Sequence, residues 1–233
     1  MKFKKYESRH EAGRFIAEFI RENHQELWKS SMNNSKKFFC FAIPNGGIPV
    51  AEGLCSQFKI NYDLLIVRKI KIPWNTEAGF GSITTDGTIL INDSLYHQLN
   101  LSEKQLQGTI ELTKDEIKER LVLYKKDEIR DKDYSEKIHD KNIFMIDDGL
   151  ASGFTMLAGI KMIKKYGPSK IYITVPTAPL STINRIKDEV DDIFCPNIRD
   201  VWRFAVAEAY LNWYDVPESE VLGIIKESKY YVE

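Results

Sequence analysis

Residues 143–155 constrain the fold of this chain more than any other part of its sequence. They begin with four apolar residues, as is typical of a strand buried on both faces, and continue with Asp147 and Asp148. A turn of small residues follows, and a helix is predicted from there to residue 166. A strand, a tight turn and a helix in this order predict an α/β unit whose strand belongs to a parallel sheet.

The rest of the chain repeats this alternation of short apolar runs and amphipathic stretches. We expect an α/β fold with a mostly parallel central sheet of about five strands and helices on both faces. Ligands of such sheets bind beyond the carboxyl ends of the strands, so the residues that follow each strand are the candidates for binding and catalysis. Further strands are predicted over residues 38–43, 63–67, 170–175 and 192–195, and helices over 10–29, 50–58, 102–126, 180–189 and from 217.

Two segments in the middle of the chain interrupt this alternation. Residues 69–81 carry Pro, Asn and Gly and are predicted to be irregular, and residues 70–82 would suit a flexible lid loop that excludes water from a site. Asp86-Gly87 stands between residues 82–84 and 88–91 and predicts a β-hairpin. Ser102 and Gln105 predict a capping box at the start of the long charged helix.

Composition narrows the classes of partner. With 233 residues, one domain over 1–233 is expected. The 33 basic and 34 acidic residues give a net charge of -1, which argues against a nucleic-acid partner. Apolar runs are too short for a membrane span, and the three cysteines form no CxxC pattern. We therefore expect a cytoplasmic protein without a disulfide framework or a zinc site.

The turn after the acidic pair has the features of an anion site. Backbone N–H groups at a helix start, together with the helix dipole, favour a phosphate there. Ser152 and Thr155 can add hydroxyl donors, and Asp147 and Asp148 can accept hydrogen bonds from sugar hydroxyls.

Two other strand ends offer complementary groups. Gly46 and Gly47 follow the first predicted strand and would allow a ligand to approach the backbone closely. Arg68 and Lys69 follow the second and could neutralise a diphosphate, or they could be a solvated pair. In the tail, Trp202 is the best candidate for stacking on a planar base, although packing of the tail could also explain its aromatic residues.

Residues 143–155 resemble the phosphoribosyl diphosphate (PRPP) signature of the type I phosphoribosyltransferases, with Ser152 where threonine is usual. Residues 43–51 resemble a P-R-G-G segment found in a subgroup of that family whose acceptor is undefined, with Asn45 in place of the arginine. Loss of this bidentate cation should weaken diphosphate binding or change the preferred anion. The resemblance continues over residues 6–17, 67–83, 175–179 and 204–210.

The resemblance implies a fold with a small hood, formed by the N-terminal helix, the C-terminal tail and the hairpin at residues 82–92, and an enzyme that acts as a homodimer. It would transfer the ribose 5-phosphate of PRPP to a nitrogenous base and release pyrophosphate, with Mg²⁺ held by ligand oxygens and water. Asp147, Asp148 and Lys69 would be catalytic. The substrate would be bound by Asn45, Gly46, Gly47, Arg68, Ala151, Ser152, Gly153, Phe154, Thr155 and Trp202.

Two alternatives stay open at this point. The chain could be a regulatory module of the same fold that senses PRPP or a nucleotide without turnover, which Asn45 favours. It could also be a hydrolase or phosphorylase of a related sugar phosphate.

Overall fold

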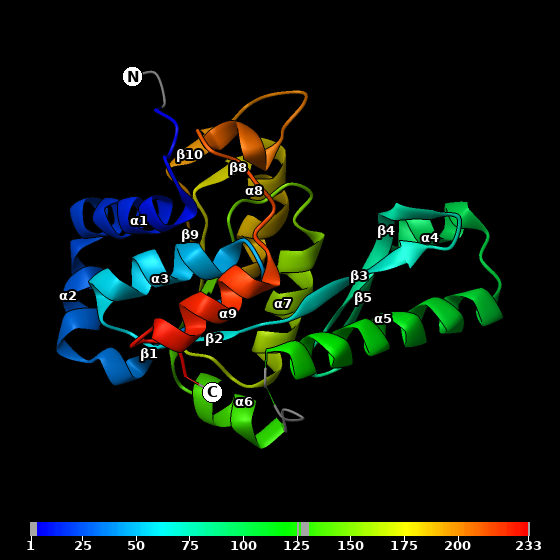
Figure 1. The fold of residues 1–233 in the computed structure, drawn as a ribbon, viewed down its shortest axis with the longest axis horizontal. Coiled ribbons are helices and arrows are strands. Elements are labelled where there is room, and N and C mark those ends of the chain that lie inside the picture. The colour runs from blue at the N-terminus through cyan, green and yellow to red at the C-terminus, as the bar shows by residue number, and fades with distance from the viewer. Residues whose placement is uncertain (1–3, 125, 127–130, 233) are drawn as a thin grey trace.

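The computed structural model describes residues 4–124, 126 and 131–232 (Figure 1). Its central sheet is parallel throughout and has five strands in the order β2-β1-β6-β7-β9, which confirms the predicted fold class. Ala42, Ile146 and Thr174 stand side by side at the ends of their strands. The residues that follow them therefore meet at one edge of the sheet. The strands are Phe38–Ala42, Tyr62–Leu64, Asn142–Ile146, Lys170–Thr174 and Asp192–Phe194, for β1, β2, β6, β7 and β9.

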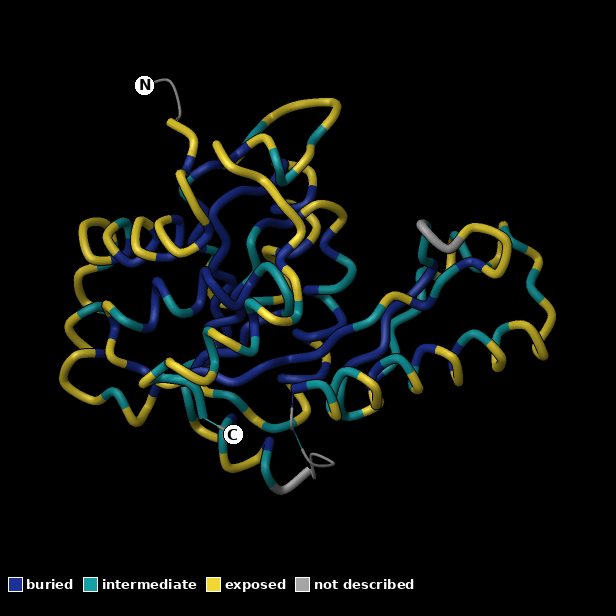
Figure 2. Tube along the Cα trace, in the orientation of Figure 1, coloured by how far each residue is buried: buried dark blue, intermediate teal, exposed yellow. Residues whose placement is uncertain are grey.

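Alternate side chains of β1 belong to two separate cores, because neighbouring residues of a strand point to opposite faces. Phe38, Cys40 and Ala42 pack on one face with α1 (Arg9–Asn23), α3 (Gly47–Phe58) and α9 (Glu218–Glu227). Phe39 and Phe41 pack on the other face with α6 (Asp131–Ile138), α7 (Phe154–Lys165) and α8 (Leu180–Ile186). Both faces are covered, so the whole strand is buried, as its unbroken apolar sequence predicts. Figure 2 shows this buried centre of the molecule.

The segment expected to be an irregular lid is instead part of an antiparallel sheet, so this prediction of conformation is wrong. Strand β3 (Val67–Ile72) pairs with β4 (Asn75–Thr84), and β4 pairs with β5 (Ile89–Ile91). Val67, Ile70 and Ile72 are buried in β3. Glycine is favoured at position 81 of β4 because the strand passes close to its neighbour: a Cβ there would lie 2.7 Å from the carbonyl oxygen of Leu90. The predicted hairpin at Asp86-Gly87 is confirmed.

These three strands and two helices, α4 (Asp93–Leu99) and α5 (Glu103–Leu123), form an arm that projects from the body of the molecule (Figure 1). Helix α5 begins at the predicted capping box of Ser102 and Gln105. Helix α4 was not predicted, and neither was α6. The hairpin at residues 82–92 was expected in the hood, but its strands pair within the sheet of this arm.

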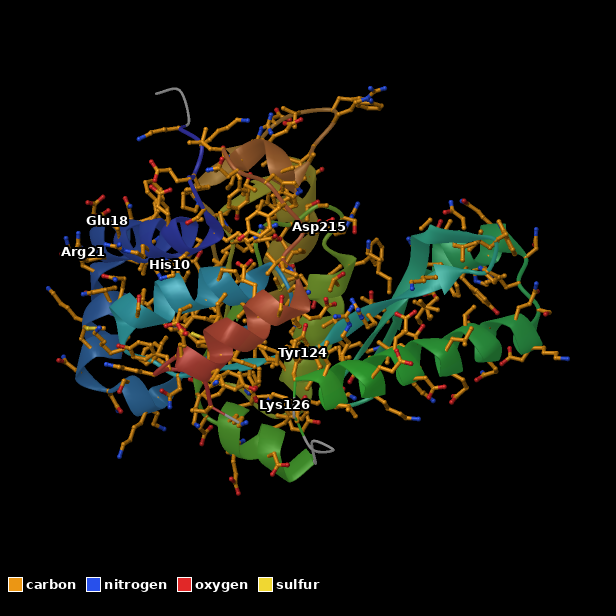
Figure 3. All side chains as sticks on the ribbon, in the orientation of Figure 1. His10, Glu18, Arg21, Tyr124, Lys126 and Asp215 are labelled. Atoms are coloured by element: carbon orange, nitrogen blue, oxygen red, sulfur yellow. The ribbon has the colours of Figure 1, made fainter. Side chains whose placement is uncertain are left out.

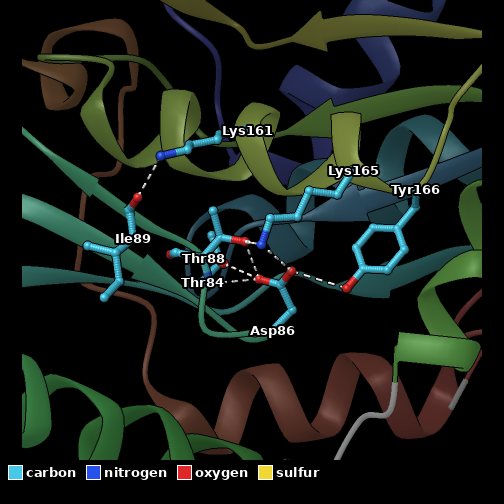
Figure 4. A network of polar contacts seen from close by, with 7 residues as sticks. All are labelled: Thr84, Asp86, Thr88, Ile89, Lys161, Lys165 and Tyr166. Atoms are coloured by element: carbon cyan, nitrogen blue, oxygen red, sulfur yellow. Dashed lines mark hydrogen bonds and ion pairs between the residues drawn. The ribbon is translucent and has the colours of Figure 1, made fainter.

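Asp86 joins the base of the arm to α7 through hydrogen bonds and an ion pair (Figure 4). Its carboxylate accepts hydrogen bonds from the Thr84 hydroxyl at 2.7 Å and the Thr88 backbone N–H at 2.9 Å. From α7 and its C-cap, Lys165 Nζ lies 3.3 Å away and the Tyr166 hydroxyl donates at 3.1 Å. The helix whose start forms the predicted phosphate loop is thus tied to the strands of the arm.

The remaining elements cover one end of the sheet and its flanks. The helix predicted over residues 10–29 is interrupted at His24, after which α2 (Gln25–Asn33) begins. A short parallel pair, β8 (Thr177–Pro179) and β10 (Asn197–Arg199), lies above the sheet, and Tyr6 bridges to Tyr210 beside it. We call these segments, residues 4–8, 177–179 and 197–216, the hood. The part of the chain that the structure describes also has three 3₁₀ turns, at Ser35–Lys37, Lys187–Glu189 and Val206–Ala209. Among the described residues, no helix combines the length and apolar character needed to cross a bilayer.

Candidate active site

A cavity of about 530 Å³ lies between the carboxyl edge of the central sheet and the arm. Its size falls within the usual range of small-molecule sites, about 300–1,000 Å³. The structure brings seven of the predicted site residues to its wall: Asn45, Gly46, Arg68, Lys69, Asp147, Asp148 and Thr155. Lys71 and Glu116, which were not predicted, also line it.

The acidic pair stands where β6 ends, as expected. Asp147 Oδ1 accepts a hydrogen bond from the backbone N–H of Asp148 at 2.8 Å. Burial raises the pKa of Asp147 well above its ordinary value, and the negative charge of Asp148 raises it further. Two adjacent carboxylates in this setting need compensation by positive charge.

Arg9 supplies part of that compensation from the first turn of α1. Its Nε lies 2.8 Å from Asp148 Oδ2, and its side chain is only 5% exposed. Burial raises the pKa of Asp148, while the hydrogen bond and charge of Arg9 act against this rise. The Tyr210 hydroxyl donates to the carbonyl oxygen of Asp148 at 2.7 Å. Neither Arg9 nor Tyr210 was predicted as a site residue, because their partner lies far away in sequence.

Residues 151–155 form the turn and helix start that the sequence predicts. Gly153 adopts φ +77, a conformation that favours glycine, and α7 begins at the next residue. From α8, the Thr182 hydroxyl donates to the Ala151 carbonyl at 2.6 Å and Arg185 donates to that of Ser152 at 2.6 Å. These hydrogen bonds fix the turn through its carbonyl oxygens. Its N–H groups are not used in them, and the first N–H groups of a helix have no partner within the helix. Such an arrangement suits an anion.

The loop after β1 packs directly on the acidic pair. A Cβ at position 46 would lie 2.0 Å from Asp148 Oδ2, so any larger residue there would have to displace the Asp148 carboxylate that Arg9 holds. At position 47 it would lie 2.8 Å from the Ile146 carbonyl oxygen. The two glycines thus allow the loop to approach the end of β6, and the Pro44–Asn45 peptide bond between them and β1 is cis.

Asn45 is engaged by other parts of the protein. Its Nδ2 donates to the carbonyl oxygen of Val216 at 2.8 Å, and its Oδ1 accepts from the Tyr124 hydroxyl at 2.7 Å. Tyr124 caps α5, and Figure 3 shows it near α9, where the arm meets the body. Nearby, Arg120 pairs with Glu218. Asn45 therefore joins the loop, the end of α5 and the segment before α9.

Arg68 and Lys69 reach the cavity from a different element than predicted. The strand before them, β2, ends at Leu64, and both lie within β3 of the arm. Arg68 Nε is buried and has no hydrogen-bond partner among the described residues. Burial and the nearby charge of Arg120 lower the pKa of Arg68. Lys71 Nζ pairs with Glu116 Oε1 at 2.7 Å.

The other predicted site residues do not line this cavity. Gly47 and residues 151–154 adjoin it along the chain. Trp202 lies in the hood and is 99% exposed, so its contact with a base stays a prediction.

The residues at the cavity would fit Mg²⁺ only if substrate oxygens and water supplied most of its ligands. No group of three or more His, Cys, Asp or Glu side chains forms a metal site within residues 4–124, 126 and 131–232. The opposite wall is basic. Mg²⁺ would therefore depend on substrate oxygens and water, the arrangement this ion commonly adopts with phosphates.

Comparison with known proteins indicates the family to which this chain belongs. The family model "Phosphoribosyl transferase domain" matches residues 6–210. Two curated proteins of Mycobacterium tuberculosis, from strains CDC 1551 and H37Rv, are both named "Putative phosphoribosyl transferase". Each is 24% identical over 222 residues, which is 95% of this chain and 46% of theirs. The chain thus spans about half the length of these relatives.

Among solved structures, TT1426 from Thermus thermophilus has a similar fold, with a TM-score of 0.71 and 21% identity. The match covers 95% of this chain and 97% of that one. Since the family model extends from Tyr6 to Tyr210 and includes both the acidic pair and the two loops beside it, the chain belongs to the type I phosphoribosyltransferase family.

Proposed function

We propose that this chain transfers the ribose 5-phosphate group of PRPP to a nitrogenous base and releases pyrophosphate. The observation that carries the proposal is one cavity with an acidic pair and a helix start on one side and basic residues of β3 on the other. PRPP has the matching chemistry, because it joins a phosphate, a ribose with two free hydroxyls and a diphosphate.

Each end of PRPP has a counterpart in the site. Residues 151–155 would bind the 5′-phosphate, and Asp147 and Asp148 would accept hydrogen bonds from the ribose hydroxyls. Arg68, Lys69 and the loop at 45–47 would face the diphosphate. Arg68 Nε, buried and without a protein partner among the described residues, supports this assignment most directly.

In the reaction, the bond between C1 of the ribose and the diphosphate oxygen breaks, and a bond from C1 to a ring nitrogen of the base forms. The base gives up a proton to solvent, and pyrophosphate leaves. Positive charge develops on the ribose, where the carboxylates stabilise it, and negative charge on the leaving group, where Arg68 and Lys69 do so. Mg²⁺, when bound with the substrate, would neutralise further charge on the diphosphate.

The second candidate is a module that binds PRPP or a nucleotide without turnover. One observation favours it: Asn45 replaces an expected cation, and its amide is committed to Val216 and Tyr124. Homodimer assembly, a cytoplasmic location and the single-domain organisation stay predictions.

The test combines calorimetry of PRPP binding in the presence of Mg²⁺ with pyrophosphate release over a panel of purine, pyrimidine and other nitrogenous bases. We expect binding and base-dependent release. Release without any base would indicate the hydrolase alternative. Binding without release for any base would favour the sensing module, and absence of binding would overturn the proposal.

A further inference from the structure

Arg9 occupies a cage of aromatic rings behind the acidic pair. The centre of its guanidinium lies 4.1 Å from the ring centroid of Trp213, and 5.4 Å and 5.5 Å from those of Tyr214 and Tyr210. Cations over aromatic faces at such distances are attracted by the ring electrons. The hood thus fixes a nearly buried arginine in one place.

The guanidinium points at the acidic pair from outside the cavity. Nε bonds to Asp148 Oδ2 at 2.8 Å, and Asp148 is the residue that lines the cavity, whereas Arg9 does not. Tyr210 contacts both partners, through its ring with Arg9 and through its hydroxyl with the Asp148 carbonyl. The Asp148 carboxylate is therefore held by Arg9, and aromatic residues of the hood hold Arg9 in turn.

We propose that Arg9 is a positioning residue, which holds the Asp148 carboxylate in the orientation and the charged form that ribose binding requires. This role rests on the proposed function of Asp148. It makes the hood part of the site even before an acceptor base arrives.

The charges around the pair support this role. Burial raises the pKa of both carboxyl groups, and Arg9 is the main group that lowers the pKa of Asp148. Without Arg9, the pKa of Asp148 should be higher. Asp148 should then lose its negative charge at a higher pH than in the wild type as the pH falls. Among the described residues, the other titratable groups that adjoin the pair or line the same cavity are Tyr210 in the hood, Arg68, Lys69 and Lys71 on β3, and Glu116 on α5.

The experiment compares wild type with Arg9→Gln and Arg9→Lys. Carboxyl ¹³C signals of labelled aspartate, assigned with Asp147→Asn and Asp148→Asn, report the titration in the free protein. PRPP affinity with Mg²⁺ is measured from pH 6 to pH 8. Arg21→Gln is the matched control, since Arg21 lies on the same helix, is 53% exposed and pairs with Glu18.

For Arg9→Gln we expect the Asp148 titration to move to higher pH, and PRPP affinity to fall at least about tenfold at pH 6 and less at pH 8, as expected for a protonated carboxyl. Arg9→Lys should recover part of the loss, and Arg21→Gln should match wild type. If Arg9→Gln does not fold, Trp213→Leu, which removes one wall of the cage, should give the same change in smaller measure.

Unchanged titration in a folded Arg9→Gln protein, or an affinity loss equal at all pH values, would show a merely structural role and overturn the inference. If wild type does not bind PRPP, the proposed function fails, but the titration still decides whether Arg9 controls Asp148.

Discussion

On one side the cavity is lined by Asp147, Asp148 and Thr155, which belong to the contiguous segment 142–155, with the loop at 43–46 beside them. The opposite wall comes from β3 and α5, which are more than thirty residues apart in the chain. The first wall is a strand, a turn and a helix start, and its backbone follows from local sequence, although Arg9 holds its Asp148 carboxylate from α1. The second depends on strand pairing and on tertiary ion pairs such as Lys71–Glu116. The side that we propose for the ribose and the 5′-phosphate is thus formed mainly by neighbouring residues, whereas the side that we propose for the diphosphate depends on contacts between elements that are distant in the chain.

Removal of a charge from the contiguous wall should have the largest effect on activity. Asp148→Asn removes the carboxylate that would stabilise positive charge on the ribose. By analogy with other single electrostatic groups, kcat/KM should fall about 10²- to 10³-fold. Steady-state pyrophosphate release measures this.

Asp140→Asn is the matched control for that variant. Its side chain is 74% exposed, and its φ of 55 is one that asparagine tolerates. Activity should be unchanged. An Asp148→Asn enzyme as active as this control would remove the acidic pair from the mechanism.

The assembled wall is tested by Arg68→Met, which keeps much of the apolar stem and removes the charge. A lost hydrogen bond to a charged group is worth about 1.5–3 kcal/mol, so PRPP should bind roughly 10- to 100-fold more weakly. Ribose 5-phosphate, which lacks the diphosphate, should bind as to wild type. Equal losses for both ligands, measured by calorimetry, would contradict the assignment of Arg68 to the diphosphate.

The contact between the glycine loop and the contiguous wall is tested by Gly46→Ala. The new Cβ would collide with Asp148, so we expect a loss of about 1–3 kcal/mol in the free energy of unfolding, together with weaker PRPP binding. Gly108→Ala on α5 meets nothing within 4 Å and should stabilise by about 0.5–1 kcal/mol. Chemical denaturation measures both, and equal effects would mean that the loop does not pack as described.

We expect the smallest effect on activity from a substitution of Asp86, which joins the base of the arm to α7. Burial alone would raise the pKa of Asp86, but hydrogen bonds from Thr88 and Thr84 and the charge of Lys165 outweigh it, so the pKa lies below its ordinary value. Its contribution to stability is therefore full above the ordinary value of about 3.9, and is lost as the pH falls through the folded-state pKa.

Asp86→Asn should lower the free energy of unfolding by about 1–2 kcal/mol at pH 7, and the difference from wild type should shrink below about pH 4. Thermal or urea unfolding from pH 3 to pH 7 measures it, with Asp140→Asn again as control. A difference that does not depend on pH would show that the Asp86 charge does not hold the arm.

The sequence predicts most of the central sheet, because apolar runs such as residues 38–43 are too continuous for a surface element. It also predicts the acidic pair, the phosphate turn and the capping box, all of which depend on neighbouring residues. It misplaces β3 and β4, because glycines such as Gly79 and Gly81, together with Pro73, are typical of loops, although here the two glycines allow strands to approach closely.

The contacts that complete the site could not be found from local patterns. Arg9 meets Asp148 across 139 positions, and Tyr124 meets Asn45 across 79. Such pairings follow from the packing of the hood and the arm, which no periodicity encodes. Arg9 belongs to the N-terminal segment that matches the family, and this was the one signal that could have drawn attention to it.

Binding of the two ends of one PRPP molecule by the two walls can be tested by ³¹P NMR of PRPP titrated with the protein and Mg²⁺. We predict that the 5′-phosphate and diphosphate resonances both respond to wild type, that Arg68→Met reduces mainly the diphosphate response, and that Thr155→Val reduces mainly that of the 5′-phosphate. Resonances that do not respond to wild type, or variants that reduce both responses equally, would contradict it.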